Sequence, residues 1–196
     1  MAQAVQALAL ELRLHHAPTA EHSHRLAAHA RVVAESLHLD ALDATEVELV
    51  AVLHDVGKLA VDRHILDWPG PLDEGQRERM RRHTIEGEEM LAGIAGLEHL
   101  APAVRATHEA WDGSGYPQGL MADHIPLIGR IVAIADAYDA MTSDRAYRKA
   151  LPHEIACGEL ERCVGSQFDP EIVPVFLHQI EEFRRIEAAA GRFIPR

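Results

Sequence analysis

Histidine and aspartate side chains occur in this sequence where they could bind metal ions together. His54 stands directly before Asp55, and the segment Asp55-Val-Gly-Lys58 predicts a turn that returns a lysine to the same pocket. Adjacent residues of a helix point about 100° apart, so this pair can reach around two cations from one backbone position. Mixed His and Asp ligands suit Mn, Fe, Ni or Zn better than Ca or Mg. A His-Asp pair alone is more often structural, so a metal site requires further ligands.

Three other positions could supply those ligands. His83 stands four residues before Gly87. This glycine either leaves space over the histidine or allows close helix packing. His108 comes just before a glycine-rich loop. Asp136 lies on an otherwise apolar helix. Because a buried carboxylate without a partner is unfavourable, Asp136 needs either a metal or a hydrogen-bonded partner. These residue types therefore point to a shared transition-metal site.

The segments between these residues are typical of helices. Apolar positions recur at helical spacing over residues 20–39, and Thr45-x-x-Glu48 predicts a capping box whose helix ends at Gly57 in a left-handed turn. Asp73-x-x-Gln76 predicts the start of a helix that continues to about residue 90. Further helices are expected over 3–15, 102–111, 127–142, 152–164 and after Asp169-Pro170. No segment alternates like a strand, so we expect a compact all-α bundle of seven or eight helices, with one long loop over 112–120.

Composition narrows the class of protein. The chain has 196 residues, of which 47% are hydrophobic and 26% charged, enough for one domain with a substantial core. Its net charge of −12 opposes binding to duplex nucleic acid, although metal ions could still attract a small anionic substrate. No apolar run is long enough to span a membrane, no signal peptide is apparent, and Cys157 and Cys163 fit no disulfide framework. We therefore expect a cytoplasmic protein.

Taken together, the motifs resemble the HD-GYP subgroup of the HD-domain phosphohydrolases. The matching segments include Leu53-His-Asp-Val-Gly-Lys58, His108-Glu-x-x-Asp-Gly-Ser-Gly-Tyr-Pro-x-Gly-Leu120 and Ala135-Asp-x-Tyr-Asp-Ala140. The resemblance implies an HD-GYP domain over residues 19–186, between a lead-in helix at 1–18 and a tail at 187–196. It also implies a phosphodiesterase that hydrolyses the bacterial second messenger cyclic di-GMP to pGpG, and then to GMP, by a metal-bridging hydroxide.

The resemblance implies a role for each matching residue. Two divalent metal ions are expected, Fe or Mn in the first place and Ni, Co or Zn as alternatives, and their ligands would be His22, His54, Asp55, His83, His108 and Asp136. Asp55 would bridge the two ions, and Lys58 would be a catalytic residue that contacts the phosphate. Gly115 and Tyr116 would meet the substrate through the GYP loop, and Arg145 and Arg148 would contact its phosphates.

Two positions depart from the family pattern. Thr107 stands where the family usually has the first of two consecutive histidines, so one nitrogen ligand is missing. Pro18 stands where some members have a glutamate that supports a third metal, so a two-metal site with one incomplete coordination sphere is expected. Three hypotheses stay open: an active cyclic di-GMP phosphodiesterase, a weakly active module that senses cyclic di-GMP or docks a protein through the GYP loop, and a phosphodiesterase for another cyclic dinucleotide such as cyclic GMP-AMP. The sequence indicates no oligomeric state.

Overall fold

Three helices form the centre of the molecule: α2 (Ala17–Ser36), α3 (Ala41–Leu53) and α8 (Leu127–Thr142). A computed structural model describes residues 1–39, 41–144 and 149–189. The central helices pack against one another because each has an apolar face. Their buried side chains include Leu26, Ala30, Val33, Val47, Val50, Ile131, Val132 and Ala135.

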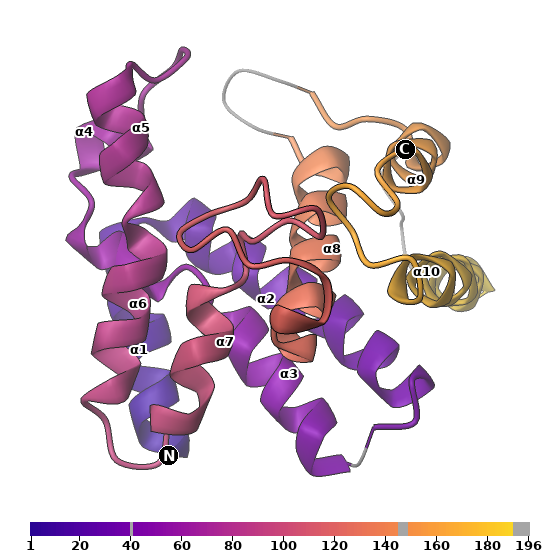
Figure 1. Cartoon of the computed structure of the whole chain (residues 1–196), viewed down its shortest axis with the longest axis horizontal. Helices are drawn as coiled ribbons and strands as arrows, with labels where there is room; N and C mark the ends of the chain where they lie inside the picture. Colours follow the sequence, from indigo (N-terminus) through magenta and orange to yellow (C-terminus); the bar gives the residue numbers. More distant parts are fainter. Residues whose placement is uncertain (40, 145–148, 190–196) are drawn as a thin grey trace.

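The remaining elements lie on two sides of this centre (Figure 1). On one side are α1 (Ala2–His15), η1 (Val56–Ala60), α4 (Arg63–Leu66), α5 (Glu74–Arg81), α6 (His83–Ala92), η2 (Glu98–Leu100) and α7 (Ala101–Arg105). On the other side are α9 (His153–Arg162) and α10 (Ile172–Ala189). The loop between α7 and α8 contains η3 (Ala122–His124). This loop crosses in front of the central helices in Figure 1, so it can cover a site formed by them.

The all-helical class predicted from the sequence is confirmed. The described residues form no strand, and only the isolated bridges Asp112–Met121 and Val164–Phe168 have strand-like pairing. Eight of the described helices have at least eight residues, namely α1, α2, α3, α5, α6, α8, α9 and α10, and α4 and α7 are single turns. No described helix combines the length and hydropathy that a membrane span requires.

Two predicted helices are shorter than expected. The helix expected from Asp73 to about residue 90 is interrupted at Arg82, where the His83 ring donates from Nδ1 to the Met80 carbonyl at 2.6 Å. This bond takes up a carbonyl that a continuous helix would use for its own backbone. The helix expected over 102–111 ends at Arg105, and Thr107 Oγ1 donates to the Val104 carbonyl at 3.0 Å. The early ending places His108 in a turn.

The predicted boundaries of α3 are wrong at both ends. The helix begins at Ala41, so Thr45 lies inside it and does not cap it, because Ala41, Leu42 and Ala44 are strong helix formers that extend the helix by a turn. The helix ends at Leu53, and Gly57 lies in η1 without a left-handed φ. A glycine is needed at this position for a different reason: a Cβ atom on Gly57 would lie only 1.9 Å from the carbonyl oxygen of His83.

Candidate metal centre

The six residues predicted as metal ligands lie close together, although they come from five separate parts of the chain. They form two groups of three: His22 with His54 and Asp136, and Asp55 with His83 and His108. Within each group, one ligand atom of each residue lies within 4.8 Å of the others. The central helices α2 and α8 carry His22 and Asp136, α6 begins at His83, and the other three residues follow the ends of α3 and α7.

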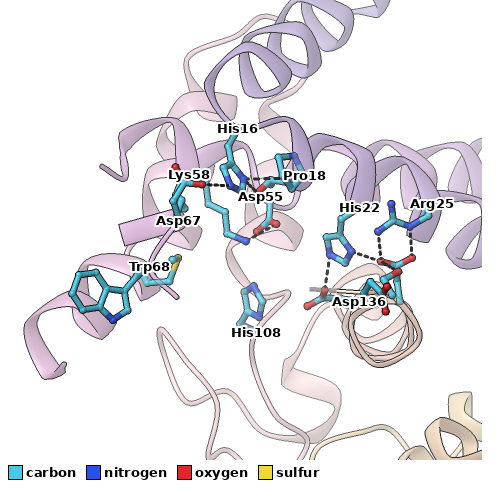
Figure 2. Close-up of a pocket in the computed structure, with 16 residues that line it drawn as sticks. His16, Pro18, His22, Arg25, Asp55, Lys58, Asp67, Trp68, His108 and Asp136 are labelled. Atoms are coloured by element: carbon cyan, nitrogen blue, oxygen red, sulfur yellow. Dashed lines mark hydrogen bonds and ion pairs between the residues drawn. The ribbon is translucent and has the colours of Figure 1, made fainter. Parts of the chain in front are cut away.

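Hydrogen bonds orient the first group. His22 donates from Nε2 to Asp136 Oδ1 at 2.8 Å and from Nδ1 to Asp139 Oδ2 at 2.6 Å (Figure 2). Arg25 donates to both oxygens of Asp139, at 2.9 and 3.0 Å. His54 donates from Nδ1 to the Ala51 carbonyl at 2.8 Å. The Nε2 atom of His54 is therefore available as a metal ligand, because its other nitrogen carries the proton.

Hydrogen bonds within this group shift the pKa values of His22 and Asp136 in opposite directions. Burial alone lowers the pKa of His22, but its hydrogen bonds to Asp136 and Asp139 outweigh burial and raise that pKa to about 9. Burial alone raises the pKa of Asp136, but the hydrogen bond from His22 and the neighbouring histidines hold it well below its usual value. In the absence of metal, His22 is thus an imidazolium held between two carboxylates. A bound cation would replace one proton at Nε2.

The second group contains buried polar atoms that have no hydrogen-bond partner. These atoms are Asp55 Oδ1, His83 Nε2 and His108 Nε2, and none finds a partner in the described part of the chain. His83 Nε2 lies 3.4 Å from Asp55 Oδ1. Buried polar atoms nearly always have partners, so three unpaired ones at one place indicate a missing partner that accepts lone pairs. A cation satisfies this requirement, and the donor set therefore fits a metal.

Protonation states in the second group also suit a metal. Burial and the neighbouring His108 lower the pKa of His83 to about 3. Burial likewise lowers the pKa of His108, although Asp136 and Asp55 oppose the effect. Burial raises the pKa of Asp55, but His54, Lys58 and His83 outweigh burial and hold that pKa well below the usual range. Neutral imidazoles next to an ionised carboxylate are the forms that bind divalent metals.

Asp55 and Lys58 connect the two groups. Asp55 Oδ2 lies 3.4 Å from His54 Nε2, while Oδ1 lies 3.4 Å from His83 Nε2, so each oxygen faces a different group. This geometry is the one that a bridging carboxylate needs. Lys58 follows in η1, and its Nζ donates to Asp55 Oδ2 at 2.6 Å. The short turn therefore places a positive charge beside the two groups, as the sequence predicts.

The GYP loop places Tyr116 against a predicted ligand. The Tyr116 ring stacks on the imidazole of His108, with 5.1 Å between ring centroids and an interplanar angle of 7°. The guanidinium of Arg81 lies 4.9 Å from the centre of the same tyrosine ring. Stacking fixes the orientation of His108. A contact between Tyr116 and substrate remains a prediction, as it does for Gly115, and Arg145 and Arg148 lie outside the described residues.

Glu109 holds the loop in place. This buried side chain accepts a hydrogen bond from the backbone of Gln118 at 2.7 Å and another from Leu120 at 3.1 Å. The glycines of the loop are required by the fold of the loop itself. A Cβ on Gly115 would lie 2.2 Å from the backbone nitrogen of Ala110, which explains that glycine without any ligand.

Two cavities meet at the predicted metal ligands. His108 and Asp136 line both of them. The larger, of about 530 Å³, contains Lys58, Asp55 and His22 in its wall and is shown in Figure 2. The smaller, of about 430 Å³, lies at the GYP loop and is lined by residues that include Tyr116 and Thr107. Space for a ligand of small-molecule size is therefore available beside both groups.

Sequence reasoning assigned no role to Arg25, Asp139 or Glu109. Arg25 follows His22 by three positions, and Asp139 follows Asp136 by three positions, so each pair shares a helical face. That spacing could have indicated the Arg25–Asp139–His22 chain of hydrogen bonds before the structure was known. No comparable local signal points to Glu109, since its partners lie nine and eleven residues further along the chain.

Comparisons with known proteins identify the family of this chain. The family model described as "HD domain" matches residues 6–172. The chain is 38% identical over 153 residues to the 3′3′-cGAMP-specific phosphodiesterase 3 of Vibrio cholerae, covering 78% of this chain and 33% of that protein. It is 38% identical over 161 residues to a cyclic di-GMP phosphodiesterase of Thermotoga maritima, covering 81% of this chain and 44% of that protein. The chain thus spans less than half the length of these relatives.

A solved structure shares the fold. The crystal structure of a cyclic GMP-AMP-specific phosphodiesterase of V. cholerae superposes with a TM-score of 0.70 at 17% identity. The superposition covers 92% of this chain and 50% of that one. At this identity, the likeness establishes the helical fold that carries the site.

Proposed function

The chain belongs to the HD-domain family, and on that premise we propose that it is a metal-dependent phosphodiesterase that hydrolyses a cyclic dinucleotide. The observation that carries the proposal is the set of three unpaired buried atoms on Asp55, His83 and His108, beside the group of His22, His54 and Asp136. The names of the relatives include both cyclic di-GMP and 3′3′-cGAMP phosphodiesterases. We take cyclic di-GMP, with pGpG as its first product, as the substrate to test first.

Two divalent ions would occupy the two groups, with Asp55 between them. Four histidines and two aspartates form a nitrogen-rich donor set that suits Fe or Mn, and also Ni, Co or Zn, better than Ca or Mg. When bound, such ions polarise the phosphoryl oxygens and lower the pKa of a coordinated water towards neutrality. The protein contributes the orientation of the ligands, which Arg25 and Asp139 secure for His22.

Lys58 is a cationic residue at the wall of the larger cavity, and we expect it to act on the substrate itself. Its ammonium group lies at the wall of the larger cavity and is partly exposed, while its partner Asp55 is buried. A fixed positive charge at this position stabilises the negative charge that builds up on phosphoryl oxygens in the transition state. It also offsets locally the net charge of −12, which would otherwise repel a dinucleotide.

Hydrolysis can be tested directly. The purified chain would be reloaded with Mn or Fe(II) and incubated with cyclic di-GMP or 3′3′-cGAMP, and the products would be separated by chromatography. Asp55→Asn should abolish product formation, because it removes the bridging charge. Asp123→Asn is the matched control, since the side chain of Asp123 is 87% exposed and pairs only with Arg130 among the described residues. Absence of product with either substrate and either metal, in protein that contains metal, would refute the enzymatic function.

A second candidate is a module that binds a cyclic dinucleotide with little turnover. Thr107 favours it, because this residue supplies no nitrogen ligand and its hydroxyl donates to the Val104 carbonyl at 3.0 Å. With Asp55 shared between the ions, the ion beside His108 would then have three protein ligands, one fewer than the ion beside His22. Calorimetric binding of cyclic di-GMP without product formation would select this alternative.

A further inference from the structure

The larger cavity is lined by both charged and apolar side chains. Trp68 lies on one side in Figure 2 and Arg25 on the other, with His108 and Lys58 between them. The large apolar side chains among the described lining residues are Leu66, Trp68 and Met80. A cyclic dinucleotide also combines charged phosphates with flat, weakly polar bases. Trp68 could therefore contact a base when a phosphate lies at the metal centre.

Trp68 is exposed to an unusual degree for such a large aromatic residue. Its relative exposure is 45%, although an indole side chain gains more free energy from burial than most others. The other large apolar side chains with comparable exposure, such as Ile155 and Met121, line neither of the two cavities. Trp68 thus presents an exposed aromatic surface at the edge of the larger cavity.

The backbone around Trp68 is fixed even though the ring is exposed. Its amide donates to the Ile65 carbonyl at 3.3 Å, and the Ile65 side chain is buried in the preceding turn of α4. The indole Nε1 lies 3.5 Å from the position that a Cβ on Gly70 would occupy, so the ring edge lies near Gly70. The backbone that carries the ring therefore loses little conformational freedom when a ligand binds.

A second link fixes this segment relative to the metal ligands. Asp67 Oδ1 lies 3.3 Å from His16 Nε2, and His16 is the N-cap residue of α2. The same helix carries His22. The position of Trp68 is therefore tied, through Asp67 and the start of α2, to the group that would hold one metal ion.

We propose that Trp68 is a stacking platform for a purine base of the substrate. The inference rests on the proposed function and adds to it the residue that binds one base. Every purine has a π-face, so stacking favours nucleotides over simple phosphate esters without selecting guanine over adenine. Removal of one base–aromatic stack weakens binding roughly 5- to 150-fold. The base and the scissile phosphate would thus be bound by separate parts of one cavity.

Steady-state kinetics of the metal-loaded chain with cyclic di-GMP give the first test. Trp68→Ala should raise KM roughly 5- to 150-fold with little change in kcat, and Trp68→Phe should recover most of the loss because it restores a π-face. Ile155→Ala is the control, since it removes an equally exposed apolar side chain outside both cavities. A KM for Trp68→Ala within twofold of the wild-type value would overturn the inference.

A binding measurement keeps this inference distinguishable from the proposed function. The chain has two tryptophans, so Trp111→Phe leaves Trp68 as the only indole. GMP should quench its fluorescence by stacking, while ribose 5-phosphate, which lacks a base, should not. Absence of quenching by GMP would overturn the stacking platform even if hydrolysis is observed. Quenching by GMP in a chain that forms no product would refute the proposed function and support the platform.

Discussion

Replacement of Gly57 by alanine should damage both the fold and the metal centre. A Cβ on this residue would lie 1.9 Å from the His83 carbonyl oxygen and 2.5 Å from the Gly87 nitrogen. Both atoms belong to the backbone of α6, so no side-chain rotation can make room. Because real Cβ contacts almost never fall below 3.0 Å, η1 and α6 must separate by about 1 Å.

The structure sets the size of the expected effect. Overpacking of a close contact typically destabilises a protein by about 1 to 3 kcal/mol, and a clash with backbone belongs at the upper end of that range. The separation also moves His83 away from Asp55. In the wild-type structure, His83 Nε2 lies 3.4 Å from Asp55 Oδ1. Misplacement of a catalytic group by about 1 Å can reduce the rate roughly 100-fold. We therefore expect a lower free energy of unfolding, by about 3 kcal/mol, and a lower metal content after reloading.

The free energy of unfolding would be measured by urea denaturation. Two other glycines provide matched controls in this experiment. A Cβ on Gly87 would lie 3.1 Å from Cγ1 of Val104, a side-chain atom that can shift, so Gly87→Ala should cost about 1 kcal/mol. A Cβ on Gly158, inside α9, would meet nothing within 4 Å, so Gly158→Ala should raise stability by up to about 1 kcal/mol. The reasoning would be refuted if Gly57→Ala unfolded within about 0.5 kcal/mol of the wild type and bound metal equally well.

Four further predictions concern the site. Arg25→Leu removes both hydrogen bonds from Arg25 to Asp139, the partner of His22. It should weaken metal binding, measured by chelator competition, roughly 10- to 100-fold. An unchanged affinity would contradict the role of Arg25 in orienting His22. The raised pKa of His22, about 9, stabilises the metal-free fold fully below pH 6.5, and this stabilisation is lost as the pH rises through 9. Metal must displace the proton on His22, so the increase in Tm that Mn causes under nitrogen should grow between pH 6.5 and 9. An increase in Tm that does not change with pH would contradict this competition between metal and proton. Thr107→His should raise metal content and turnover, and no change in either would show that Thr107 is not the weak point of the site. Lys58→Met should lower kcat roughly 100- to 1000-fold with a smaller change in KM, and a normal kcat would exclude Lys58 from transition-state stabilisation.

Periodic sequence patterns predicted some elements well because those elements are determined locally. The helix expected over 127–142 is α8, with the same bounds, since its apolar positions repeat at helical spacing along an unbroken segment. The predicted capping box is present: the side chains of Asp73 and Gln76 each accept a hydrogen bond from the backbone nitrogen of the other residue. The capping box predicted at Thr45 fails because equally good helix formers precede it, and a local motif does not exclude a longer helix.

Contacts between distant segments could not be predicted from the sequence. The sequence pattern predicts a left-handed helix end at Gly57, because glycine often serves that purpose. Its actual role depends on the approach of η1 to α6, which only the tertiary structure reveals. The stacking of Tyr116 on His108 and the anchoring of the loop by Glu109 are of the same kind.

The two metal groups differ in what holds them, and this difference bears on the role of Thr107. His22 and Asp136 lie on α2 and α8, the central helices, and the buried Asp139 orients His22. His83 and His108 instead depend on the contact of η1 with α6 and on the stacked loop at the end of α7. The second group therefore depends on contacts between segments outside the central helices, and Thr107 directly precedes its predicted ligand His108. A core-mounted group can keep its geometry without a metal, whereas the second group leaves three buried atoms unpaired until a metal binds. Loss of metal should therefore disturb the second group more than the first.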